Sequence, residues 1–177
     1  MKAVLISIRP EWCKKIASGE KTVEIRKTFP TLKAIQRLPI KCYIYCTKSA
    51  GKFAIPNADG KPVESAGKII GEFTCDSFGY YNGLLVWNKE ERYIKEACVS
   101  LDEIDAYRNG KGVYLWHISN LHIYPEPVDL KDFWGTKPCG KPYDCCACEK
   151  WDNDKMDCDK PLSITRPPQS WCYVEEP

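Results

Sequence analysis

The chain has 177 residues, about the length of one domain. Hydrophobic residues make up 44% of it, enough for a core, and its formal net charge of +2 excludes a strong overall field that would attract long nucleic acids. No stretch approaches the roughly 18 apolar residues of a membrane helix, and the first apolar run is too short for a signal peptide, so we expect a cytoplasmic protein with no membrane partner.

The first half of the chain is predicted to contain short strands and one short helix. Apolar alternation and apolar runs favour strands at 3–8, 22–26 and 40–46. A helix is expected over 10–18, because Pro10 fits its first turn and Gly19 stops it. Residues 47–67 hold Gly, Pro, Asn and Asp at the density of turns, which predicts a long loop or a hairpin insertion.

The second half continues in the same way. Further strands are expected at 68–77, 112–118, 121–124 and 171–174. Residues 80–96 form a mixed aromatic and charged stretch that could include a helix, and the capping-box pattern from Ser100 to Glu103 starts another helix that runs through Tyr107. Short strands, few helices and Gly/Pro turns together predict a β-rich α+β fold built on a small barrel.

The segment 19–26, which reads GEKTVEIR, is the most informative for function. Its apolar residues alternate with polar ones, so Glu24 and Arg26 are expected on one face of a strand with Lys21 at its entrance. A lysine, a carboxylate and an arginine on one face could hold a nucleotide or a phosphate. The alternative is a solvated strand face with an ion pair between residues two apart.

Three segments resemble a known family. GEKTVEIR resembles the G-x-K-x-x-E-x-R signature of ASCH domains (activating signal cointegrator homology), a branch of the PUA-like β-barrels. Residues 5–12 resemble that family's LSI-x-P-x-W opening, and residues 112–118 with 123–127 resemble its late aromatic strand and P-x-P turn. The resemblance covers roughly residues 3–135 and implies a PUA-like barrel, although one fold carries many functions.

The resemblance implies a cleft for a single nucleotide, a modified base or short single-stranded RNA. Such ligands stack on aromatic rings and are held at their base edges by hydrogen bonds. We therefore predict binding of RNA or of a modified nucleoside or nucleotide. The predicted ligand-binding residues are Ser7, Arg9, Trp12, Lys21, Glu24, Arg26 and Trp116.

A hydrolase is the first alternative. Some bacterial members of the family are acetylcytidine amidohydrolases that use the signature Lys, a Thr three residues later and a Glu on a later helix. Lys21 matches, but Glu24 stands where the Thr would be, and Glu103 is a candidate for the later Glu. A carboxylate beside Lys21 favours the charged amine over a nucleophile. If the protein is an enzyme, Lys21 and Glu24 are its catalytic candidates.

A ribonuclease would need an acid and a base. His117 and His122 are the only histidines in the chain. His117 lies inside an aromatic strand beside Trp116, which favours a histidine in the core or on a barrel face.

Eleven cysteines require an explanation. The odd count and the lack of an export signal argue against a disulfide framework. Five cysteines lie in or beside apolar or strand-like segments and are predicted to be buried structural thiols: Cys13, Cys42, Cys46, Cys75 and Cys98.

The segment 138–160 is cysteine-rich and has few aliphatic residues, so it needs another source of order. Four thiolates at short spacing can bind a structural zinc ion in a closed tetrahedral site. The predicted ligands are Cys139, Cys145, Cys148 and Cys158, with Cys146 and Cys172 as possible substitutes. The alternative is a loop with free or oxidised thiols.

The predicted organisation has three parts: a barrel at 1–135, a cysteine-rich and zinc-binding insertion at 136–162, and a C-terminal strand and tail at 163–177 that returns to the barrel. In the tail, Arg166, Gln169 or Trp171 could reach a pocket, or Trp171 and Tyr173 could plug the barrel end. A protein-interaction module that uses the zinc-binding segment and the 47–67 loop stays open as a further alternative.

Overall fold

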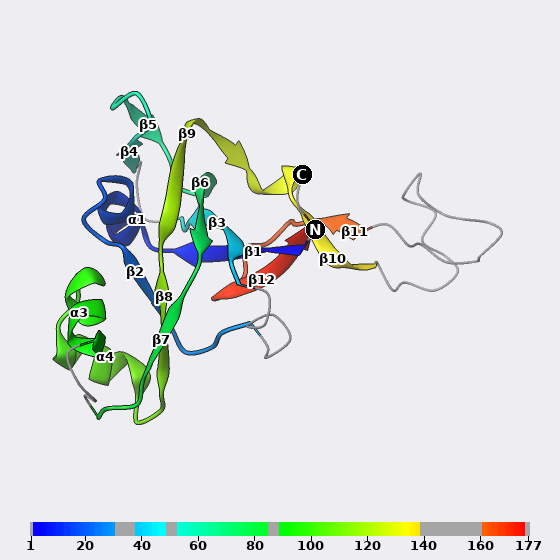
Figure 1. Ribbon diagram of the computed structural model, residues 1–177. Helices are drawn as coiled ribbons and strands as arrows, with labels where there is room; N and C mark the ends of the chain where they lie inside the picture. The colour runs from blue at the N-terminus through cyan, green and yellow to red at the C-terminus, as the bar shows by residue number, and fades with distance from the viewer. Residues whose placement is uncertain (1, 31–37, 49–52, 85–88, 139–160, 176–177) are drawn as a thin grey trace.

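The computed structural model describes residues 2–30, 38–48, 53–84, 89–138 and 161–175. Its largest unit is a seven-stranded sheet with the order β11-β10-β12-β1-β3-β6-β9 (Figure 1). The strands of this sheet are β1 (Lys2–Ile8), β3 (Ile40–Cys46), β6 (Lys68–Cys75), β9 (Ser119–Asp129), β10 (Trp134–Pro138), β11 (Pro161–Ser163) and β12 (Trp171–Glu175).

Two smaller sheets and short helices complete the described part. A three-stranded sheet has the order β2-β8-β7, and a hairpin pairs β4 with β5. Their strands are β2 (Val23–Arg26), β7 (Phe78–Tyr81), β8 (Val113–His117), β4 (Ala54–Pro56) and β5 (Pro62–Glu64). The helices are α1 (Pro10–Ala17), α3 (Lys89–Glu96), α4 (Leu101–Arg108) and the 3-10 turn η1 (Leu130–Asp132). The prediction of a β-rich fold with short helices is confirmed.

The strand pairing does not close into one barrel within the described residues. The chain instead passes from the large sheet to the small one twice, between β1 and β2 and between β6 and β7, and it returns between β2 and β3 and between β8 and β9. Asn120, just inside β9, has a positive φ of 47°, a backbone conformation that Asn tolerates better than most residues. The two sheets are therefore joined by strands that continue from one into the other.

Strand β1 lies at the centre of the large sheet and is apolar on both faces. Val4 and Ile6 pack with Ile16 of α1 on one face, whereas Leu5 packs with Tyr43 and other residues on the opposite face. β1 pairs with β3 in parallel and with β12 in antiparallel register. Because both faces are covered, β1 reads as a continuous apolar run rather than as an alternating one.

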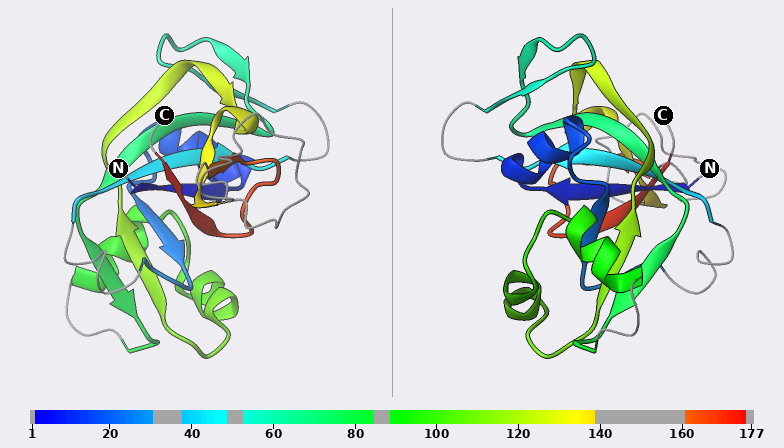
Figure 2. Two further views of the ribbon diagram at one scale, coloured as in Figure 1. Left: turned by 90° about the vertical axis from the view of Figure 1, so that its right-hand side faces the viewer. Right: turned by 60° about the vertical axis from the view of Figure 1, so that its left-hand side comes forward.

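A third core lies between the small sheet and the helices α3 and α4, which cover it at the end of the molecule away from the β4–β5 hairpin (Figures 1 and 2). Helix α4 begins at the predicted capping box: the Ser100 side chain accepts the Glu103 N–H at 3.2 Å, and the Glu103 carboxylate accepts the Ser100 N–H at 2.8 Å. The helix ends at Asn109, which adopts the left-handed conformation. This helix supplies one wall of the pocket described below.

The cysteines divide into two groups. Cys13, Cys42, Cys46 and Cys75 are buried, and Cys98 is half-buried. The four predicted zinc ligands, Cys139, Cys145, Cys148 and Cys158, lie outside the described residues. Within the part of the chain that is described, no cluster of three or more His, Cys, Asp or Glu side chains could hold a metal ion, and no helix is long and apolar enough to cross a membrane.

Candidate functional site

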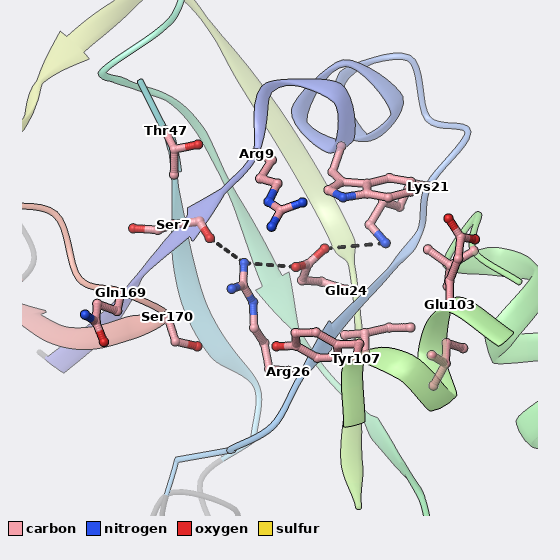
Figure 3. Close-up of a pocket in the computed structure, with 14 residues that line it drawn as sticks. Ser7, Arg9, Lys21, Glu24, Arg26, Thr47, Glu103, Tyr107, Gln169 and Ser170 are labelled. Atoms are coloured by element: carbon pink, nitrogen blue, oxygen red, sulfur yellow. Dashed lines mark hydrogen bonds and ion pairs between the residues drawn. The ribbon is translucent and has the colours of Figure 1, made fainter. Parts of the chain in front are cut away.

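A cavity of about 500 Å³ lies where α1, β2 and α4 meet the segment before β12 (Figure 3). Six of the seven residues predicted to bind a ligand line this cavity: Ser7, Arg9, Trp12, Lys21, Glu24 and Arg26. Two of them precede α1, Trp12 lies within it and the other three follow it, so the helix brings the family-like opening and the GEKTVEIR segment to one place.

Buried charges form the floor of the cavity. Glu24 lies between two cations: its Oε2 is 3.5 Å from Lys21 Nζ, and its Oε1 is 2.9 Å from Arg26 Nη2. The side chains of Lys21, Glu24 and Arg26 are only 3%, 7% and 10% exposed. The period of β2 explains the shared face, but the burial contradicts the alternative of a solvated strand face.

Each cation is also anchored to a neighbouring element. Lys21 Nζ donates to the Ala97 carbonyl at 2.7 Å and lies 5.1 Å from the centre of the Trp12 ring. Arg26 Nη2 donates to the backbone carbonyl of Ser7. The charged row, by which we mean Lys21, Glu24 and Arg26, therefore connects β2 to β1, to α1 and to the segment between α3 and α4. A partner for Arg26 Nε–H is missing among the described residues, although this atom is buried.

The wall formed by α4 carries a carboxylate and an aromatic ring. Glu103, Ile104 and Tyr107 line the cavity at helical spacing. Hydrogen bonds from the backbone N–H and the hydroxyl of Ser100 hold the pKa of the Glu103 carboxyl below its ordinary value. Glu103 is thus an anion at neutral pH, and the exposed ring of Tyr107 has Lys27 Nζ 4.8 Å from its centre.

The remaining wall comes from the C-terminal segment and the end of β3. The Ser7 hydroxyl donates to the Pro168 carbonyl at 2.6 Å, and the Ser7 N–H donates to the Ser170 carbonyl at 2.9 Å. These bonds hold Gln169 and Ser170 against the cavity, on the side away from Glu103, where Thr47 also lies (Figure 3).

Strand β2 offers its backbone as well as its side chains. It is the edge strand of the small sheet, and β8 covers only one of its edges. The N–H of Ile118 donates to the Thr22 carbonyl, toward β2, whereas the N–H of His117 donates to the Ser77 carbonyl, toward β7. Backbone groups of successive residues alternate in direction, so those of Trp116 and its register partner Glu24 point toward each other. By alternation, the N–H and C=O of Ile25 point away from β8, at a residue that lines the cavity.

Comparison with solved structures gives a clear likeness of fold. A crystal structure of ASCH from Zymomonas mobilis aligns with a TM-score of 0.60 and 20% identity, over 98% of this chain and 88% of that one. The chain has the fold of an ASCH domain. Two single-substitution mutants of the same Zymomonas mobilis protein align with TM-scores of 0.60 and 0.58, at 20% and 19% identity, over 99% and 98% of this chain and 92% and 89% of theirs. No protein-family model matches the chain, and no curated protein does.

The ASCH resemblance inferred from the three segments is thus confirmed for the fold. At about one identical residue in five, the likeness establishes architecture and leaves the activity to be argued from the pocket.

One predicted ligand-binding residue lies elsewhere in this ASCH fold. Trp116 is fully buried, packs edge-on against Phe29 with ring centres 4.8 Å apart, and is absent from the cavity lining. Trp171 packs against it rather than entering the pocket, with ring centres 6.1 Å apart. An aromatic side chain on a strand can face either a cleft or the core. Trp116 faces the core, so it is not part of the proposal below.

Neither histidine lines the cavity. His117 is half-buried and its Nδ1 lies 2.7 Å from Asp76 Oδ1, while His122 packs against the Tyr124 ring. Cys13 on α1 is no candidate nucleophile either, because burial raises the pKa of its thiol well above its ordinary value. The acid and base that a histidine-dependent ribonuclease would need are therefore not at this pocket.

Sequence reasoning missed several lining residues, chiefly Thr47, Ile104 and Tyr107. Tyr107 could have been found from Glu103, because residues four apart share one face of a helix. Thr47 had no local signal, since it reaches the pocket only through the parallel pairing of β3 with β1.

Proposed function

We propose that this ASCH-fold protein binds RNA, or a modified nucleoside or nucleotide, with one base in the cavity above Lys21, Glu24 and Arg26. The observation that carries the proposal is the buried charged row itself. Removing three charges from water is costly, and a protein that needed only stability would be served as well by apolar residues. Arg26 Nε–H adds a buried donor that has no acceptor in the described protein, and a ligand in the cavity is a natural source of one.

The chemistry of the cavity matches a base. Its volume falls in the range of small-molecule sites. Base edges combine carbonyl acceptors with amine donors, which suit the Arg26 guanidinium, the Glu24 carboxylate and the open backbone groups of Ile25. The rings of Trp12 and Tyr107, each with a lysine ammonium group nearby, add aromatic surface on which a base can stack.

A ligand screen with a matched pair of variants tests the proposal. Lys21 and Lys41 have similar partners, because each pairs with a glutamate and lies 5.1 Å from the centre of an aromatic ring, but of the two only Lys21 lines the cavity. We would measure thermal shifts with nucleosides, nucleotides and short RNAs, including acetylated and methylated bases. At least one compound should stabilise the wild type and Lys41→Met, and that shift should disappear in Lys21→Met.

Circular dichroism of each variant would verify that the fold is intact. The proposal fails if no compound in the screen stabilises the wild type, or if a folded Lys21→Met keeps the full shift.

A hydrolase acting on a modified base is the second candidate, because Glu103 lines the same cavity as Lys21. An amine nucleophile or base must be uncharged to react. The carbonyl, the carboxylate and the aromatic face around Lys21 each interact favourably with an ammonium group, so we favour binding over turnover. The mass of the stabilising compound after incubation separates the two: a binder leaves it unchanged, whereas an amidohydrolase replaces an acetyl group with hydrogen.

We also propose that Cys139, Cys145, Cys148 and Cys158 bind one structural zinc ion. Their spacing supports this. Metal analysis of the purified protein should find about one zinc per chain, reduced in Cys145→Ser. A metal-free protein with an unchanged melting temperature on addition of zinc would contradict the assignment.

A further inference from the structure

A second cavity of about 420 Å³ adjoins the base pocket. Thr47 at the end of β3 lines both. The second cavity is further lined by Tyr45, Lys48, Lys131 and Thr165. Figure 3 shows the shared residue Thr47, together with Gln169, on the side of the first cavity opposite Glu103.

The two cavities share a second wall. The segment before β12 contributes Thr165 and Pro167 to the second cavity, and then Gln169 and Ser170 to the first. The hydrogen bond from the Ser7 hydroxyl to the Pro168 carbonyl fixes this segment at the midpoint between them. The two cavities are therefore neighbours, connected by Thr47 and by the segment 165–170.

Positive charge dominates the second cavity. Asp129, which also lines it, contacts Lys68 and lies 3.8 Å from Lys131, so its carboxylate is already matched by lysines. Lys48 has no ion pair with any residue in the described ranges. Its stem lies over Gly67, where an added Cβ would come within 3.0 Å of it. The surplus cations and the hydroxyls of Thr47 and Thr165 make a site suited to a phosphate.

The absence of a side chain at Gly67 therefore shapes this site. Gly67 has a φ of +80°, which L side chains rarely adopt, and it leaves room for the Lys48 side chain to lie along the cavity.

We propose that the second cavity binds the phosphodiester and the adjoining nucleotide of an RNA strand whose neighbouring base occupies the first cavity. The natural ligand is then an oligonucleotide rather than a free nucleoside. This inference rests on the proposed function of the first cavity and extends it to the neighbouring cavity.

The inference is tested by comparing the affinity for a nucleoside with the affinity for a dinucleotide that contains the same base. The probes are the four common ribonucleosides and N4-acetylcytidine, each alone and joined to uridine through a 5′ or a 3′ phosphodiester. One dinucleotide should bind about tenfold more tightly than its nucleoside, the gain expected of a charge-assisted phosphate contact. The gain should shrink as salt is raised, whereas nucleoside affinity should not change.

Two double variants separate the subsite from general charge. Lys48→Gln with Lys131→Gln should remove the dinucleotide gain and leave nucleoside affinity unchanged. Lys61→Gln with Lys95→Gln removes the same charge at exposed positions on the hairpin and on α3, and should keep the gain.

The outcomes distinguish the two proposals. If a nucleoside binds but no dinucleotide binds more tightly, or if both double variants reduce the gain equally, the second subsite is overturned and the base pocket stands. If neither nucleoside nor dinucleotide binds, the base pocket fails, and the subsite fails with it.

Discussion

Two lysine–glutamate pairs of this molecule have similar partners but different surroundings. Lys21 pairs with Glu24 at 3.5 Å beside Trp12, and Lys41 pairs with Glu72 at 3.2 Å beside Tyr43. The Lys21 side chain is 3% exposed and that of Lys41 is 37% exposed. Burial, rather than pairing, is what separates them.

The half-buried pair of Lys41 and Glu72 is satisfied within the protein. The Tyr124 hydroxyl donates to Glu72 at 2.6 Å, and Lys41 serves the other carboxylate oxygen. Burial alone would raise the pKa of the Glu72 carboxyl, but these hydrogen bonds outweigh it and leave the pKa below its ordinary value. The buried pair instead shares its carboxylate with Arg26, whose Nε–H lacks a partner in the described protein. A buried and incompletely satisfied network beside a cavity is typical of a binding site, whereas a complete one at the surface contributes modestly to stability.

The largest expected difference comes from removing each glutamate charge. Glu24→Gln leaves Lys21 and Arg26 buried without their counter-charge, and should lower the free energy of unfolding by about 3 kcal/mol. Glu72→Gln, at the half-buried and more solvated pair, should cost about 1 kcal/mol or less. Urea denaturation of both variants measures this. Equal losses would show that burial does not distinguish the pairs.

A smaller effect is expected when the charge is kept and the geometry is changed. Arg26→Lys retains a cation but loses the planar guanidinium, whose Nη2 contacts both Glu24 and the Ser7 carbonyl and whose buried Nε–H has no partner in the described protein. It should lower the free energy of unfolding by about 2 kcal/mol. It should also lower the affinity for the compound that stabilises the wild type in the screen, by about tenfold. Calorimetric titration provides the affinity, and an unchanged value would mean that the guanidinium does not touch the ligand.

The smallest effect concerns pH and the half-buried pair of Lys41 and Glu72. Because the pKa of Glu72 is lower in the folded protein, its contribution to stability is present above its unfolded pKa of about 4.3 and is lost as pH falls toward the folded value. Tyr124→Phe removes one of the hydrogen bonds that lower this pKa, so the variant should lose less stability than the wild type between about pH 6 and about pH 3. A steeper loss in the variant would contradict this assignment. Other acidic groups remain in both proteins, so their contributions cancel in the comparison.

Local patterns in the sequence were sufficient for the parts of the site that depend on one element. Alternation at 22–26 placed Glu24 and Arg26 on one face, and the capping box located the start of α4. The family-like segments supplied Ser7, Arg9 and Trp12 of the lining.

The rest of the site depends on contacts between distant segments, which no local pattern records. Thr47 reaches the cavity because β3 pairs with β1. Gln169 is one of three tail residues expected to reach a pocket, and it does so because β12 also pairs with β1. The burial of Trp116 depends on Phe29 and Trp171, which lie far from it in the sequence. The open arrangement of two sheets in place of one barrel follows from where the chain crosses between them, near Ile118 and Asn120.

The most direct test of the central claim is an NMR titration of the isotope-labelled protein with nucleosides and RNA dinucleotides, in which the signals of the two pairs are followed side by side. The account predicts that the Ile25 amide, the Arg26 Nε–H and the Trp12 indole N–H shift with added ligand, while the amides of Lys41 and Glu72 stay in place. Shifts that gather around Lys41 and Glu72, with Ile25 and Arg26 unchanged, would contradict the claim that the buried charged row forms the binding site.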